Sequence, residues 1–101
     1  MAFGSLLRDL RHKQKVGIKQ VARDLGVNYT YLSKLENEKS KPSQDLVEKI
    51  ARYFDCDKDL LCIAADRIPE DAMEAIRRRP EEALTFLRHL LKDDNSKRRS
   101  E

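Results

Sequence analysis

The chain has 101 residues and a formal net charge of +3, with three glycines, three prolines and no tryptophan. Such a charged composition, poor in residues that favour turns, is typical of an all-helical protein with one small domain and a tail. No stretch provides the roughly 20 apolar residues that span a membrane, and the first residues do not resemble a secretory segment. We therefore expect a cytoplasmic protein without membrane contact.

The positive charge is concentrated in the first half of the chain. Residues 1–54 carry eleven Lys or Arg and six Asp or Glu, a balance of +5, whereas residues 55–101 have a balance of −2. A basic region of this kind is a candidate for binding a polyanion such as nucleic acid.

Apolar residues at helical spacing predict five helices in the first two-thirds of the chain. The first helix is amphipathic, with Phe3, Leu6 and Leu10 on one face. Ser43 and Asp57 are suited to cap the start of the fourth and fifth helices. The expected helices cover about residues 2–15, 18–25, 29–36, 44–54 and 58–65.

The tail is predicted to contain two further helices, over about residues 69–78 and 80–93, because Pro69 and Pro80 each suit the first position of a helix. Residues 94–101 are expected to form a flexible basic end. Two short helices cannot readily bury all the apolar residues of this tail against each other. We expect the tail to pack on the first domain and on a second subunit. The alternatives are that the tail folds back on its own domain only, or that the fifth helix, alone or with the tail, forms the dimer contact. The predicted dimerisation residues are Met73, Ile76, Leu84, Leu87, Leu90 and Leu91.

The stretch VARDLGVNYTYLSKLEN, residues 21–37, contains two short helices joined by a tight turn, which is the pattern of a helix-turn-helix. Ala22 is small at the place where the two helices would cross. Gly26 can adopt the left-handed conformation that ends the first helix. The residues expected to face the core on the other side of the turn are Val27, Leu32 and Leu35.

The residues left facing outward on the second of these helices are mostly short and polar, unlike the Glu and Lys of an ordinary surface helix. Such groups can reach the edges of base pairs in a DNA major groove. The alternative is a plain helical hairpin with a polar surface. The predicted base-contacting residues are Asn28, Tyr29, Thr30, Ser33 and Lys34.

Residues 3–64, and above all the motif LGVNYTYLSKLENEKSKPS, resemble the XRE family of helix-turn-helix regulators, the lambda- and Cro-like phage-repressor type. The resemblance implies a five-helix, lambda-repressor-like domain whose third helix lies in the major groove. It also implies a two-fold dimer on a palindromic operator in double-stranded DNA.

The resemblance carries several roles onto this chain. Arg11 and Glu36 match a salt bridge beneath the recognition helix, and Arg11 also faces phosphate. Ile18 stands where many members have a phosphate-binding Gln, so Lys19 or Gln20 is expected to anchor that position. The phosphate-contacting residues implied in this way are Arg11, Lys19, Gln20, Lys39, Ser40 and Lys41.

The loop after the recognition helix departs from the family pattern, because Glu38 occupies a position where members often have glycine. A positive φ is unfavourable for Glu, so we expect Asn37 to adopt the left-handed conformation instead.

Few residues offer catalytic or metal-binding chemistry. Neither His12 nor His89 lies in a catalytic or metal motif, and Cys56 and Cys62 lack a second Cys/His pair. We expect no enzyme activity, no cofactor and no metal, with both thiols reduced in or near the core.

The sequence thus predicts an all-helical protein with three parts: a DNA-binding domain over 1–66, a helical dimerisation tail over 67–93, and the flexible end 94–101. It favours a homodimeric transcriptional regulator, acting as a repressor or autoregulator in the cytoplasm and nucleoid. The alternative is an antitoxin-like or partner-binding regulator whose last helices bind a toxin or a peptidase.

Overall fold

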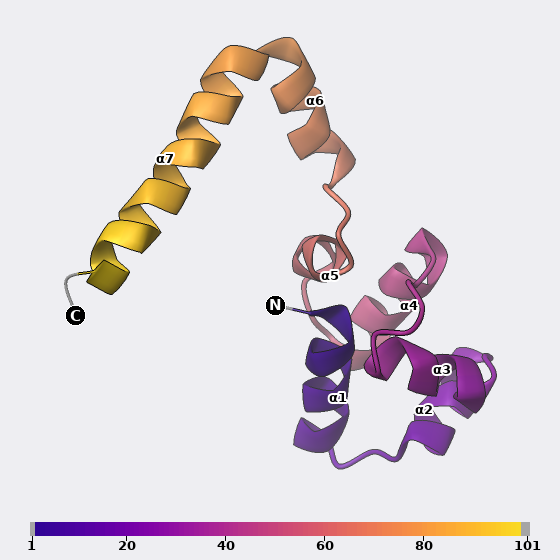
Figure 1. The fold of residues 1–101 in the computed structure, drawn as a ribbon. Helices are drawn as coiled ribbons and strands as arrows, with labels where there is room; N and C mark the ends of the chain where they lie inside the picture. Colours follow the sequence, from indigo (N-terminus) through magenta and orange to yellow (C-terminus); the bar gives the residue numbers. More distant parts are fainter. Residues whose placement is uncertain (1, 100–101) are drawn as a thin grey trace. The chain divides into compact units, whose positions relative to one another are not determined.

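The computed structural model describes the backbone of residues 2–99 and the side chains of residues 2–92. This part of the chain is all helical and contains no strand, as the sequence predicts (Figure 1). The helices are α1 (Phe3–Lys13), α2 (Ile18–Leu25), α3 (Tyr29–Glu36), α4 (Gln44–Phe54), α5 (Lys58–Ala64), α6 (Glu70–Arg78) and α7 (Pro80–Arg99).

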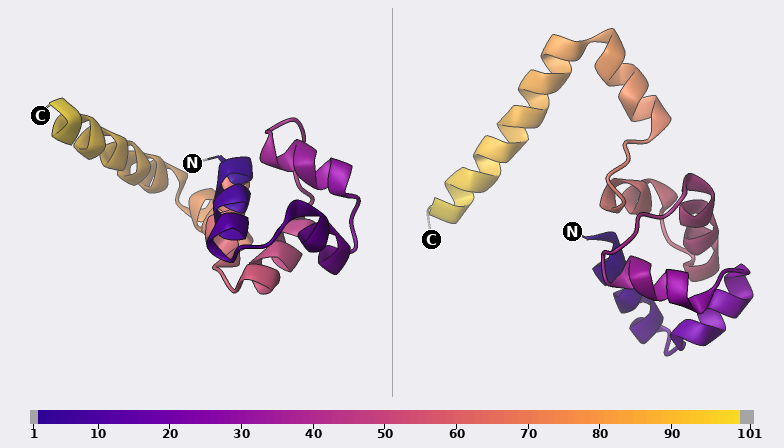
Figure 2. Two further views of the ribbon diagram at one scale, coloured as in Figure 1. Left: turned by 90° about the horizontal axis from the view of Figure 1, so that it is seen from below. Right: turned by 45° about the vertical axis from the view of Figure 1, so that its right-hand side comes forward.

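The chain forms two compact units, Met1–Ile68 with α1–α5 and Pro69–Glu101 with α6 and α7. In the first unit α1 packs on α3 and α5, while α4 packs on α2 and α5. Figures 1 and 2 show these helices as a bundle of short segments that cross steeply. The first unit therefore has the compact five-helix arrangement that the sequence predicts.

One apolar core holds the first unit together. Each helix of this unit contributes the apolar face that its periodicity predicts, and burial of one such side chain stabilises a fold by about 1.5–3 kcal/mol. The largest side chains that are fully buried are Leu7, Leu32, Leu35, Ile50, Leu61, Val21 and Val47.

The predicted helix caps are present. Asn28 Oδ1 accepts the Thr30 N–H at 2.7 Å, and Ser43 Oγ accepts the Leu46 N–H at 3.1 Å. Asp57 Oδ1 accepts the Asp59 N–H at 2.8 Å. These bonds satisfy donors that the start of a helix leaves without partners.

Several helix ends differ from the predicted ones, and three of the differences have a visible consequence. α1 ends at Lys13, because Lys15 takes a φ of 57° and the Val16 N–H then donates to Arg11 O at 3.0 Å. Pro69 is the N-cap of α6 and not its first helical residue. α7 continues to Arg99, past the predicted end at 93. The flexibility predicted for 94–101 lies outside the side chains described and stays a prediction.

In the second unit α6 and α7 pack against each other. Met73, Ile76 and Ala83 are half-buried there, and no residue of α6 is buried. The large apolar residues of α7 remain exposed by 42–66%, namely Leu84, Phe86, Leu87, Leu90 and Leu91.

Candidate nucleic-acid interface

The turn between α2 and α3 sets the orientation of α3. Gly26 has a φ of 73°, as predicted, and the Val27 N–H donates to Ala22 O at 2.9 Å. Ala22 is buried where α2 meets α3, and Leu32 and Leu35 point into the core. Because the inner face of α3 is fixed in this way, its outer face is held in one orientation.

The predicted base-contacting residues lie together on this outer face. Asn28, Tyr29, Thr30 and Lys34 are exposed, and Ser33 is half-buried. The cap bond to Thr30 uses the side-chain oxygen of Asn28, so the amide nitrogen is the group that it can offer outward. The face presents an amide, an aromatic ring, hydroxyls and one ammonium group.

Lys19 of α2 lies beside the start of α3. Its Nζ is 5.2 Å from the centroid of the Tyr29 ring, within the range of a cation–π contact. This contact places Lys19, which is predicted to bind a phosphate, next to Tyr29, which is predicted to contact a base.

Gln20, unlike Lys19, is hydrogen-bonded to another side chain of α2. Its Nε2 donates to both carboxylate oxygens of Asp24, at 2.9 and 3.1 Å, and Asp24 also accepts the Tyr53 hydroxyl at 2.6 Å. The hydroxyl bond, and then the amide bond, lower the pKa of Asp24, and the carboxylate raises the pKa of Tyr53. This network joins α2 to α4, and no pattern in the sequence predicted it.

The predicted phosphate-contacting loop follows α3. Lys39 and Lys41 are exposed, and Ser40 is half-buried. The Lys39 N–H closes the turn by donating to Lys34 O at 2.8 Å. Lys41 Nζ lies 3.9 Å from the exposed Asp66 carboxylate, a surface pair that contributes little on its own.

Glu36 anchors the end of α3 from beneath, and its predicted salt bridge with Arg11 is confirmed. Glu36 is 5% exposed, and Arg11 binds its two oxygens through Nε at 2.5 Å and Nη2 at 2.9 Å. Arg11 Nη1 also donates to Val16 O at 3.0 Å. The bond to Glu36 raises the pKa of Arg11. These contacts give Arg11 a structural position, and its phosphate contact stays a prediction.

Arg8 was missed by the sequence analysis. Its Nε lies 3.3 Å from Glu36 Oε1, and its Nη2 donates to Asn37 Oδ1 at 3.1 Å. The spacing of three residues between Arg8 and Arg11, on one face of α1, is the signal that could have identified it.

The prediction for the backbone after α3 was wrong. Glu38 has a φ of 60°, whereas Asn37 has a φ of −95°. Asn37 is held by its own side chain, whose Nδ2 donates to Ser33 O at 2.9 Å. Glu38 Oε1 accepts the Gly4 N–H at 2.6 Å. This bond stabilises the left-handed backbone conformation of Glu38, which Glu rarely adopts.

Comparison with known proteins agrees with this geometry. The family model described as helix-turn-helix matches residues 7–61, more than half of the chain. The chain belongs to the helix-turn-helix family of the XRE type. This result confirms the resemblance seen in the sequence and the lambda-repressor-like, all-helical fold, and members of this family are DNA-binding transcriptional regulators.

Two curated proteins are similar in sequence to this helix-turn-helix protein. It is 30% identical over 74 residues to an uncharacterized HTH-type transcriptional regulator of Mycobacterium tuberculosis, covering 73% of this chain and 53% of that protein. It is 29% identical over 69 residues to the ImmF control region 10 kDa protein of Bacillus phage phi105, covering 68% of this chain and 77% of that protein. The chain thus spans about half the length of the mycobacterial relative. No solved structure matches it.

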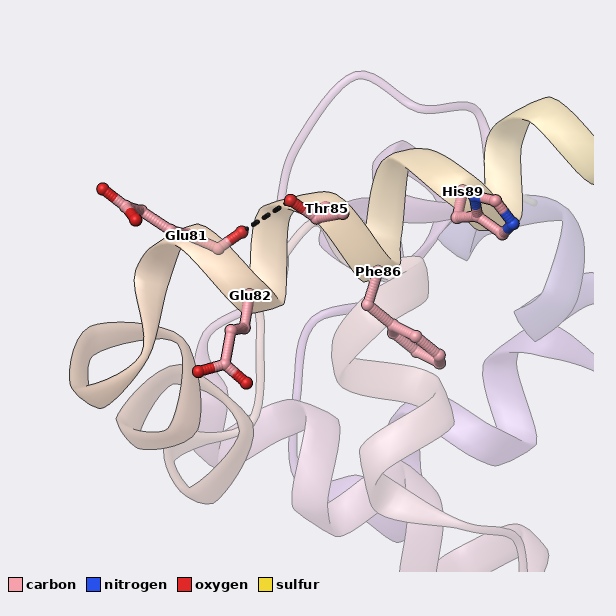
Figure 3. Close-up of a pocket in the computed structure, with 5 residues that line it drawn as sticks. All are labelled: Glu81, Glu82, Thr85, Phe86 and His89. Atoms are coloured by element: carbon pink, nitrogen blue, oxygen red, sulfur yellow. Dashed lines mark hydrogen bonds between the residues drawn. The ribbon is translucent and has the colours of Figure 1, made fainter.

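Other surfaces of the helix-turn-helix protein offer less chemistry. The hollow in Figure 3 is lined by residues of α7 alone, where Thr85 Oγ1 donates to Glu81 O at 2.9 Å. Side chains from one helix cannot enclose a ligand. In the described part of the chain, no group of three His, Cys, Asp or Glu side chains could hold a metal ion, and no helix suits a membrane span.

Proposed function

We propose that the protein is a sequence-specific transcriptional repressor that regulates its own gene, in the cytoplasm and on the nucleoid. It binds a palindromic operator as a homodimer, with one α3 helix in each of two major grooves. The observation that supports this most directly is the outer face of α3. Short polar side chains are exposed there, while the opposite face is anchored in the core.

In this proposal the base contacts come from α3. Lys34 donates to guanine O6 and N7, the Thr30 methyl meets a thymine methyl, and Asn28, Tyr29 and Ser33 complete the reading face. Each good contact is worth about 1–3 kcal/mol of discrimination against a wrong base.

The phosphate contacts supply affinity and register. Lys19, Lys39 and Lys41 are exposed on α2 and on the loop after α3, and Ser40 lies between two of them. Gln20 reaches a phosphate only by giving up its bonds to Asp24. Arg11 supports the recognition helix from below, and its predicted phosphate contact is kept as part of this proposal.

A homodimer doubles the number of base pairs that are read, with half-sites about 10 base pairs apart. The tail is our candidate for the contact, because the predicted residues Leu84, Leu87, Leu90 and Leu91 are exposed there, and Met73 and Ile76 are only half-buried. A patch of this kind on a small protein marks an interaction surface.

Charge on α7 favours an antiparallel pair of these helices. Glu81 and Glu82 stand in the first turn, and Arg88 and Lys92 stand further along. In an antiparallel pair the acidic start of one helix lies beside the basic part of the other, whereas parallel helices would bring like charges together. We therefore propose that α7 of a second copy covers this face.

The second candidate function is an antitoxin-like regulator whose tail binds a toxin or a peptidase. The same exposed apolar face supports it. Light scattering of the purified protein separates the two candidates. A mass of two chains that falls to one in Leu87→Ser/Leu90→Ser, but not in Thr85→Ala, supports the homodimer. A monomeric wild type favours a different partner.

Fluorescence anisotropy tests the DNA proposal, with the duplex upstream of the protein's own gene and a scrambled duplex at two salt concentrations. We expect wild type to prefer the upstream duplex. Thr30→Ala/Lys34→Ala should lose at least about tenfold of that preference, because base contacts carry specificity. The control is Lys58→Ala on α5, which removes one positive charge, as the double variant does. Equal binding to both duplexes that falls steeply with salt would contradict specific reading.

A further inference from the structure

Helix α1 begins without a cap of its own. Its N-cap residue, Ala2, makes no side-chain cap bond, and no acidic residue lies in its first turn. The first N–H groups of a helix have no partners within the helix, and the positive end of the helix dipole lies beside them. The start of α1 therefore needs an acceptor from elsewhere in the chain.

Glu38 provides that acceptor from 34 residues away. Its Oε1 accepts the Gly4 N–H at 2.6 Å, and its negative charge faces the positive end of α1. To do so Glu38 takes a φ of 60°, in a region that strongly prefers glycine. A glycine at 38 would suit the backbone, but it would leave α1 uncapped.

The fit between the two segments also depends on Gly4. A Cβ at this position would clash with Glu38 Oε1 and Leu35 O, and it would lie 2.6 Å from Glu36 O. Backbone atoms cannot move aside as a flexible side chain can. The start of α1 and the end of α3 therefore touch at a place where only glycine fits.

Glu38 directly precedes the basic loop of Lys39, Ser40 and Lys41. The Lys39 N–H is fixed to the end of α3, by its bond to Lys34 O. The bond of the Glu38 carboxylate to the Gly4 N–H adds a second attachment at the start of the loop, to helix α1. Two attachments fix the direction in which the loop leaves α3.

We propose that Glu38 is a positioning residue for DNA binding. Its carboxylate caps α1 and so holds the loop in the conformation that presents Lys39, Ser40 and Lys41 to the phosphates. The proposal rests on the proposed function, because it assigns the loop to DNA. It makes the first residues of the chain a support for the interface, although they do not touch DNA themselves.

Three substitutions separate the contributions of Glu38. Glu38→Gln keeps an oxygen acceptor and removes the charge. Glu38→Ala removes the acceptor and keeps the unfavourable φ. Glu38→Gly removes both the acceptor and the unfavourable φ, so it can be more stable than Glu38→Ala. Each variant is studied as the full chain, at a temperature where circular dichroism shows it folded.

The first readout is the Gly4 amide, observed by NMR and hydrogen exchange without DNA. We expect this amide to be protected in wild type and in Glu38→Gln, and to exchange fast in Glu38→Ala and Glu38→Gly. An amide that is equally protected in all four proteins would overturn the proposal, whatever the protein does with DNA.

The second readout is the dissociation constant for the upstream duplex. Glu38→Ala and Glu38→Gly should bind about threefold to tenfold more weakly, in line with the loss of a cap, and Glu38→Gln should stay within about twofold of wild type. A merely structural role would let Glu38→Gly bind as wild type does, and that result would overturn the proposal. A wild type without preference for the duplex would instead count against the proposed function, and the amide readout would still test the cap.

Discussion

The two units of this protein differ in how far they bury their apolar residues, although the first unit also exposes Leu60 and Ile63. In α1–α5, Leu7, Leu32 and Ile50 are fully buried. In the described part of the tail no residue is buried, and Leu90 and Leu91 are 52% and 66% exposed. The first unit therefore carries its own core, whereas the tail has an apolar surface that its own two helices do not cover.

The largest expected contrast between the units concerns their ion pairs. Arg11→Met leaves the carboxylate of Glu36 buried without its main partner and should lower the free energy of unfolding by about 3–5 kcal/mol. The matched change Arg77→Met breaks an exposed pair with Glu70 and should cost at most about 1 kcal/mol. Urea denaturation of both variants measures this, and similar losses would contradict the difference in burial.

The apolar residues should show the next largest contrast. Leu32→Ala opens a cavity in a full core and should lower the free energy of unfolding by about 2–5 kcal/mol. Leu90→Ala removes an exposed side chain, so its effect on the first unit should stay within about 0.5 kcal/mol. Thermal unfolding followed by circular dichroism, at a low protein concentration, tests the pair. A large loss in Leu90→Ala would mean that the tail side chain is buried.

A smaller effect should come from the exposed network that joins α2 and α4. The lowered pKa of Asp24 means that its contribution is present at neutral pH and is lost as pH falls through that pKa, below the ordinary value of 3.8. The raised pKa of Tyr53 means that its contribution is lost as pH rises through that pKa, above 10.0.

Tyr53→Phe should therefore destabilise the protein slightly between about pH 4 and pH 10, with the difference from wild type fading at both ends. Denaturation midpoints across this range measure it. A difference that persists unchanged in acid, with both proteins folded, would show that the hydroxyl acts without Asp24.

The parts of the fold that the sequence predicted are those with local causes. Gly26 and Asn28 determine the turn between α2 and α3 through backbone and cap chemistry within a few residues. Helical periodicity of apolar residues was enough to place the core. The Arg11–Glu36 pair came from the resemblance to a known family, because no local pattern links residues 25 apart.

The parts that were missed depend on contacts between distant segments. Glu38 was expected to avoid a positive φ, which is sound for an isolated residue, but Gly4 supplies a bond that changes the preference. Arg8 was missed for the same reason, since its partners lie on α3 and just after it. α7 passes its predicted end although Asp94, Asn95 and Ser96 are weak helix formers, and no local pattern explains the extension.

Gly4 gives the start of this protein an unusual pattern of mutational tolerance. Alanine is the mildest replacement at most helical positions, yet at position 4 even one methyl group meets two backbone carbonyls. Its neighbour Ser5 is exposed, so we expect that position to tolerate many side chains. A substitution at position 4 is therefore limited by space and not by chemistry, so the start of the chain is constrained by the residues at the end of the recognition helix and just after it.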